Sequence, residues 1–95
     1  MLFAILFEDN PDADPNIRKS LMPDHLAFLE NQKGQVHAAG PMKERDGTPA
    51  GGLWLVDAAS AEAVDALVKS DPFWPTGLRK SYQVLAWTQV FKQES

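Results

Sequence analysis

The chain has 95 residues, 44% of them hydrophobic, with a formal net charge of −4 and no cysteine. This length and composition predict one globular domain over residues 1–95. The lack of cysteine excludes disulfides, thiolate metal sites and a cysteine nucleophile, and the absence of a run of Lys or Arg argues against nucleic acid and anionic membranes as partners.

The first half of the chain predicts a strand, a helix and a second strand. Residues 2–7 form a continuous apolar run that needs cover on both faces. The run is too short for a signal peptide or a membrane span, so we expect a cytoplasmic protein. Asp14-Pro15 is typical of a helix start. Pro23 lacks the amide that would bond to residue 19 and predicts a kink or a restart of this helix, which Gly34 ends.

The second half predicts two more strands around a second helix. Residues 36–40 form a short strand that Gly40-Pro41 ends, and residues 42–52 indicate a mobile hairpin connection. Residues 53–56 are the third strand. Ser60 caps the second helix, and Pro72 stops it because a proline disfavours helical backbone at the preceding residue. Residues 82–91 form the last strand.

The order strand, helix, strand, strand, helix, strand is that of an α+β, ferredoxin-like βαββαβ fold with an antiparallel sheet. Two helices cover only one face of such a sheet. Three of the four strands nevertheless carry large apolar residues toward both faces, as Phe3 and Leu2, or Trp54 and Leu53, show. A face of this kind left open would be a large apolar patch, so we expect a homodimer formed through the sheet face.

One stretch holds residues with potential for chemistry: Ser70-Asp71-Pro72-Phe73-Trp74-Pro75. Asp71 ends the second helix, and the prolines and the two aromatic side chains would place its carboxylate in a pocket of low polarity. Its candidate partner is His25, on the apolar stripe of the first helix. If Asp71 accepts a hydrogen bond from one ring nitrogen of His25, the other nitrogen can act as a base. The alternative is that Asp71 caps a turn, Phe73 fills the core and His25 is structural.

Other polar residues give weaker signals. Arg18 precedes His25 by two helical turns and shares its face if the helix is continuous. His37 is expected to be an exposed strand residue, and two histidines without metal-ligand spacing predict no metal site. Arg79 and Lys80 could attract an anion but are expected at the surface. No glycine pattern has phosphate-loop spacing, and no serine lies in a G-x-S-x-G pattern, so nucleotide binding and serine hydrolysis are unsupported.

Taken together, these residues resemble the YCII-related family of small proteins over nearly the whole chain. The matching points are Arg18, His25-Leu26, Phe28-Leu29, Gly34, Ala39-Gly40-Pro41, Gly47, Gly52, Ser60, Asp71-Pro72-Phe73, Gly77-Leu78 and Trp87. The resemblance implies the dimeric α+β barrel form of the ferredoxin-like fold and a pocket in which His25 and Asp71 form the active site. It does not imply one reaction, since related dimeric barrels include isomerases, dehydrohalogenases and monooxygenases.

Two hypotheses follow from the sequence. In the first, the protein is a cofactor-free enzyme in which His25 and Asp71 move a proton on a small organic substrate, including aromatic ones, in an elimination, isomerisation or hydrolysis. Arg18 would bind an oxygen of this substrate, and Phe73 and Trp74 would contact its apolar body. In the second, the protein is a dimeric small-molecule-binding or accessory protein without turnover. A dyad that opens onto a cavity favours the first hypothesis, and a dyad sealed in the core favours the second.

Overall fold

The computed structural model describes residues 1–93 and contains a four-stranded antiparallel sheet with two helices. The elements in chain order are β1 (Leu2–Asp9), α1 (Asn16–Asn31), β2 (Val36–Lys43), β3 (Pro49–Asp57), α2 (Ala61–Ser70), a short 3-10 helix η1 (Trp74–Thr76) and β4 (Arg79–Ala86). The strand order is β2-β3-β1-β4. This is the ferredoxin-like arrangement that the sequence predicts. None of the helices formed by the described residues is long and apolar enough to cross a membrane.

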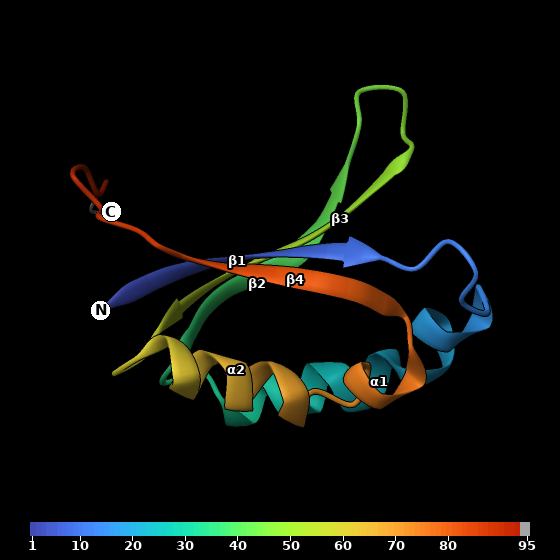
Figure 1. The fold of residues 1–95 in the computed structure, drawn as a ribbon, viewed down its shortest axis with the longest axis horizontal. Helices are drawn as coiled ribbons and strands as arrows, with labels where there is room; N and C mark the ends of the chain where they lie inside the picture. Colours follow the sequence, from blue (N-terminus) through green and yellow to red (C-terminus); the bar gives the residue numbers. More distant parts are fainter. Residues whose placement is uncertain (94–95) are drawn as a thin grey trace.

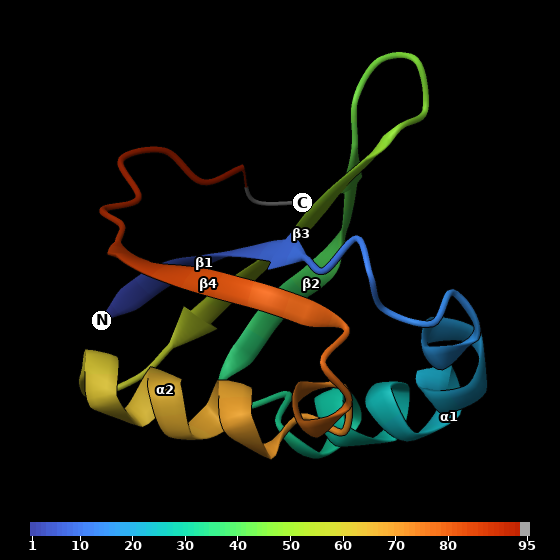
Figure 2. The ribbon, with the colours of Figure 1, turned by 45° about the vertical axis from the view of Figure 1, so that its right-hand side comes forward.

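Both helices lie against the same face of the sheet, as Figures 1 and 2 show. Alternate residues of a strand point to opposite faces, and β1 follows this rule: Phe3, Ile5 and Phe7 are buried beneath the helices. Trp54 and Val56 of β3 complete this layer, and the side chains of α2 pack against it. The core therefore lies between the sheet and the helices.

The other face of the sheet carries no helix. Leu2, Leu6, Leu53 and Leu55 point to it and are half-buried, and Leu85 of β4 is exposed. The β2–β3 hairpin rises from this side of the sheet (Figure 1). Apolar side chains thus gather on a face that this chain does not cover, as the sequence predicts.

Several predicted boundaries are wrong. Strand β2 continues through Gly40-Pro41 to Lys43, and β3 already begins at Pro49, so the predicted connection over residues 42–52 shrinks to residues 44–48. Pro41 is tolerated because β2 is an edge strand, whose outer side needs no hydrogen bonds. The last strand begins and ends earlier than predicted, at Arg79 and Ala86 rather than at residues 82 and 91.

The helix ends agree better with the prediction, except that α1 ends at Asn31, before the predicted stop at Gly34. The Asp14 carboxylate accepts a hydrogen bond from the Asn16 amide at 2.9 Å, next to the start of α1. Helix α1 runs without a break through Pro23, so the predicted restart is wrong. Ser60 caps α2 by accepting from the amide of Ala63 at 3.2 Å, and the backbone of Asp71 is extended after the last turn. The helix stops there because Pro72 follows.

Candidate functional site

His25 and Asp71 meet where the middle of α1 passes the end of α2. The Nδ1 atom of His25 lies 2.9 Å from Oδ1 of Asp71, and both residues are buried. This contact confirms the prediction that the two residues meet across 46 positions of sequence. An ionised carboxylate only accepts hydrogen bonds, so Nδ1 carries a proton, and in the neutral imidazole Nε2 keeps its lone pair. The carboxylate of Asp71 thus orients the imidazole of His25 as it would orient a general base. The catalytic role of the pair stays a prediction.

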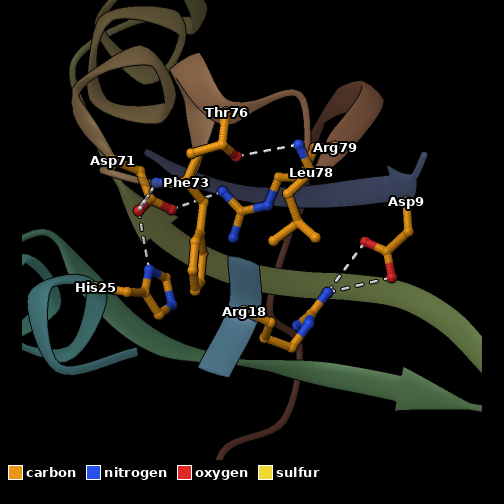
Figure 3. A network of polar contacts seen from close by, with 8 residues as sticks. All are labelled: Asp9, Arg18, His25, Asp71, Phe73, Thr76, Leu78 and Arg79. Carbon is orange, nitrogen blue, oxygen red and sulfur yellow. Dashed lines mark hydrogen bonds and ion pairs between the residues drawn. The ribbon is translucent and has the colours of Figure 1, made fainter. Parts of the chain in front are cut away.

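The Asp71 carboxylate receives three hydrogen bonds, which Figure 3 shows. Besides the bond from His25, Oδ1 accepts one from the amide of Phe73 at 3.1 Å, and Oδ2 accepts one from Nη1 of Arg79 at 2.6 Å. Burial alone would raise the pKa of Asp71, but the bonds from His25, Phe73 and Arg79 together outweigh it and hold the pKa below its ordinary value. Asp71 is therefore ionised at neutral pH, without any exposed surface on its side chain.

The sequence predicts Arg79 as a residue that could attract an anion but misplaces it at the surface. Its side chain is only 7% exposed, and the centre of its guanidinium lies 4.1 Å from the centre of the Phe7 ring. Burial lowers the pKa of Arg79 below its ordinary value, and the attraction of Asp71 opposes this shift. The surface location expected for Arg79 is therefore wrong.

A bulge in β4 explains why Arg79 points inward. Tyr82 and Val84 of β4 pack against the core, and strict alternation would place Lys80 on the same side. On β1, however, Glu8 pairs with Ser81 while the next residue pairs with Arg79, so that Lys80 is an extra residue in β4. This shift turns Arg79 toward the core and leaves Lys80 exposed. The inward orientation of Arg79 follows only from the pairing register of β1 and β4, and no residue type in the segment predicts it.

The dyad opens onto a cavity of about 150 Å³. Its wall contains both charged and apolar side chains. They come from Asp9, Arg18, Met22, His25, Leu26, Leu29, Trp54, Phe73 and Arg79, with Ala39, Gly40, Pro41 and Gly52 of the neighbouring strands. His25 has one ring nitrogen on Asp71 and borders this cavity. Its Nε2 is therefore the nitrogen that a molecule in the cavity can reach.

Arg18 lies at the mouth of this cavity. Its Nη2 contacts both carboxylate oxygens of Asp9 at 3.2 Å, and the two side chains are partly exposed. Because α1 is continuous, Arg18 shares a face with His25, as the sequence predicts for an unbroken helix. Asp9 and Arg18 also line an outer groove of about 410 Å³ between the hairpin and the loop before α1. The Arg18–Asp9 pair thus borders both the inner cavity and the outer groove.

The two aromatic residues predicted for substrate contact lie in different places. Phe73 borders the cavity, and its ring stacks on His25 with 4.4 Å between ring centres. Trp74 does not border the cavity and instead packs edge-on against Tyr82 at 5.3 Å. His37 is exposed on β2, as expected. Among the described residues, no three acidic or histidine side chains gather in a way that could hold a metal ion.

Comparison with known proteins identifies relatives of this chain. Residues 1–88 match the family model of the YCII-related domain. A similar solved structure is that of 5-chloro-2-hydroxyhydroquinone dehydrochlorinase (TftG) from Burkholderia phenoliruptrix AC1100, in complex with 2,5-dihydroxybenzoquinone. The two chains are 30% identical, the match covers 93% of this chain and 94% of that one, and the TM-score is 0.78. No curated protein matches the chain.

Proposed function

This chain belongs to the YCII-related family, and we propose that it is a cofactor-free acid–base catalyst acting on a small organic molecule. His25 is the general base in this proposal, and Asp71 holds the imidazole in the required tautomer and stabilises its protonated form. The observation that carries the proposal is that the dyad lies at the wall of a cavity, with Nδ1 on the carboxylate and Nε2 free. A dyad sealed in the core would have favoured the binding-protein alternative.

The size of the cavity limits the substrate. A cavity of about 150 Å³ has room for a molecule of roughly benzene size. Phe73 and Trp54 offer aromatic surface to such a ring, and Arg18 can bind an oxygen on its edge. Trp74, which does not border the cavity, has no place in this proposed contact. The outer groove beyond Arg18 gives a route of entry.

The reaction class follows from the position of the free nitrogen. Nε2 of His25 takes a proton from a hydroxyl group or an acidic carbon of the substrate, and the electron pair left behind moves to oxygen or expels a leaving group. Elimination and isomerisation begin with such a step, and in hydrolysis the same nitrogen takes a proton from the attacking water. The similar dehydrochlorinase, whose name describes removal of hydrogen chloride from a chlorinated hydroxyhydroquinone, supports elimination as the first reaction to test.

A second copy of the chain belongs to the proposal. The apolar side chains on the open face of the sheet, such as Leu53 and Leu55, are only half-buried, and no helix of the described residues lies on that face (Figure 2). Packing of two such faces would bury them both and would form a dimeric barrel. A homodimer through the sheet face is therefore part of this proposal. A cytoplasmic location remains a prediction of the sequence.

Chloride release from 5-chloro-2-hydroxyhydroquinone without oxygen tests the proposed chemistry. His25→Gln should lower turnover about 10²–10⁴-fold, because positioned acid–base catalysis contributes about this much. His37→Gln is the matched control, since it removes an exposed imidazole outside the cavity and should retain full turnover. Thermal unfolding of each variant verifies its fold.

The outcomes separate the two candidate functions. Equal turnover of the wild type and His25→Gln would make the dyad structural. If the chlorinated substrate is not turned over, a ligand retained by the purified protein and identified by mass spectrometry supplies the next substrate class. A ligand that binds in the cavity and is never converted would favour the binding-protein reading.

A further inference from the structure

Arg79 has hydrogen-bonding capacity that the protein does not use. A guanidinium carries five N–H groups. Within residues 1–93, the only hydrogen bond that the side chain of Arg79 donates is that of Nη1 to Asp71. No fully shielded side-chain nitrogen or oxygen of the described residues lacks a partner. The unpartnered nitrogens of Arg79 are therefore accessible, although its side chain is more than nine-tenths buried. Because Arg79 lines the cavity, these N–H groups face the space where a ligand would lie.

The surroundings of this guanidinium are apolar. It lies over the Phe7 ring at 4.1 Å, with the ring centres of Trp54 and Phe73 at 5.2 and 5.5 Å. Little water competes for hydrogen bonds in such a place, and the local dielectric constant is low, so a bond from Arg79 to an anion gains strength. Figure 3 shows one amino group of the guanidinium directed to Asp71 and the other pointing away from it.

Both carboxylates at the cavity are paired with a cation. Asp71 is shared between Arg79 and His25, and Asp9 pairs with Arg18. The charge of Arg18 acts unfavourably on Arg79 and that of Asp9 favourably, so the two arginines lie within electrostatic range of each other. A negatively charged oxygen placed between them would accept hydrogen bonds from the free N–H groups of both.

We propose that Arg79 is a second ligand-binding residue of this cavity and that it binds, together with Arg18, an anionic oxygen carried on a planar ring of benzene size. The proposal rests on the proposed function only in placing the ligand in this cavity, and it does not require turnover. In a catalysed reaction, a substrate O–H bond breaks, its proton forms a new bond to Nε2 of His25, and the electron pair stays on the oxygen that Arg79 holds.

Benzoate and benzamide are suitable probes, because they have nearly the same shape and differ in charge. We would measure their dissociation constants by calorimetry at neutral pH. The wild type should bind benzoate at least about tenfold more tightly than benzamide, since a charge-assisted bond to a guanidinium adds more than about 1.4 kcal/mol. In Arg79→Met this preference should fall to about threefold or less.

Lys80→Met is the matched control, since it removes the same charge from the adjacent, exposed position and should keep the full preference. If Arg79 serves only to hold Asp71, Arg79→Met weakens both probes equally and the ratio stays unchanged, which overturns the proposal. A wild type without preference for benzoate overturns it as well. Should Arg79→Met fail to fold, Arg79→Lys carries the test: its single ammonium group stays on Asp71, so the preference should still fall. An unchanged ratio in Arg79→Lys counts against the proposal. The probes are not turned over, so these outcomes do not depend on whether His25 is a base.

Discussion

Replacing Asp71 with Asn changes one oxygen for an amide nitrogen and should destabilise the fold strongly. The carboxylate accepts three hydrogen bonds from three donors, of which the bond from Arg79 is the shortest at 2.6 Å. An asparagine has one accepting oxygen and one donating NH₂ group. If the oxygen faces Arg79, the NH₂ group faces the amide of Phe73; if it faces Phe73, the NH₂ group faces Arg79. Either orientation brings a donor against a donor in a buried site.

The size of the effect follows from these contacts. A buried donor without a partner costs about 1–3 kcal/mol, and the buried charge of Arg79 also loses its counter-ion. Removing one partner of a buried ion pair costs about 3–5 kcal/mol in total, so we expect the free energy of unfolding of Asp71→Asn to fall by this amount. For a domain of this size the melting temperature should fall by more than about 10 °C. Urea denaturation of Asp71→Asn, with Asp24→Asn as an exposed control on α1, measures the difference.

The same substitution has a defined pH dependence. The pKa of Asp71 in the folded protein lies below its ordinary value of 3.8. The unfolded state therefore binds a proton first as the pH falls, and the ionised carboxylate stabilises the folded protein above about pH 4. The stability difference between wild type and Asp71→Asn should shrink as the pH drops below 4. A difference under about 1 kcal/mol at pH 7, or one that grows below pH 4, would refute this account of the network.

Three further predictions concern the rest of the molecule. Light scattering should return twice the chain mass of 10.5 kDa, and Leu53→Glu should yield the monomer or unfold the protein; a monomeric wild type would refute the open-face argument. Tyr82 donates to Asp65 at 2.8 Å, and burial together with this bond raises the pKa of Tyr82 to about 12. Its contribution to stability is therefore present below pH 10 and is lost as the pH rises toward 12, and Tyr82→Phe should remove that loss in alkaline denaturation. Gly51→Ala should destabilise the protein far more than Gly47→Ala in thermal unfolding: both glycines have positive φ, but a Cβ at Gly51 would lie 1.9 Å from a carbonyl oxygen of β1 and one at Gly47 meets nothing; equal losses would contradict this.

The sequence was sufficient for the fold because its local signals agree with one another. The apolar runs, the Ser60 cap and the proline after Asp71 each fix an element or its end, and together they give the order of the strands and helices. The boundaries of β2 and β3 could not be predicted in the same way. Hydrogen bonds to a neighbouring strand extend them through Gly40-Pro41 and toward Pro49, residues whose own preferences favour turns.

The candidate site was predictable only in part, for the same reason. His25 and Asp71 could be paired because each lies at a definite point of a helix and both helices cover one face of the sheet. Arg79 could be named as a residue able to attract an anion but could not be placed in the buried site, since a bulge of one residue decides whether Arg79 or Lys80 points inward. The place of Trp74 likewise depended on the turn after Asp71, which directs Phe73 to the cavity and the next ring to Tyr82.

The two oxygens of Asp71 bind two different residues of the proposed site. Oδ1 accepts the hydrogen bond from His25, so the negative charge of Asp71 stabilises the imidazolium that forms when Nε2 binds a proton. Oδ2 accepts the hydrogen bond from Arg79, whose positive charge offsets part of the carboxylate charge. Asp71 therefore stabilises the imidazolium less strongly. The loss is offset if the same arginine holds the oxygen that becomes negative when the proton leaves. An enzyme of this design stabilises the ion pair formed by the base and its substrate from both ends, because the bond to Asp71 holds the guanidinium of Arg79 at the wall of the cavity where the anion forms.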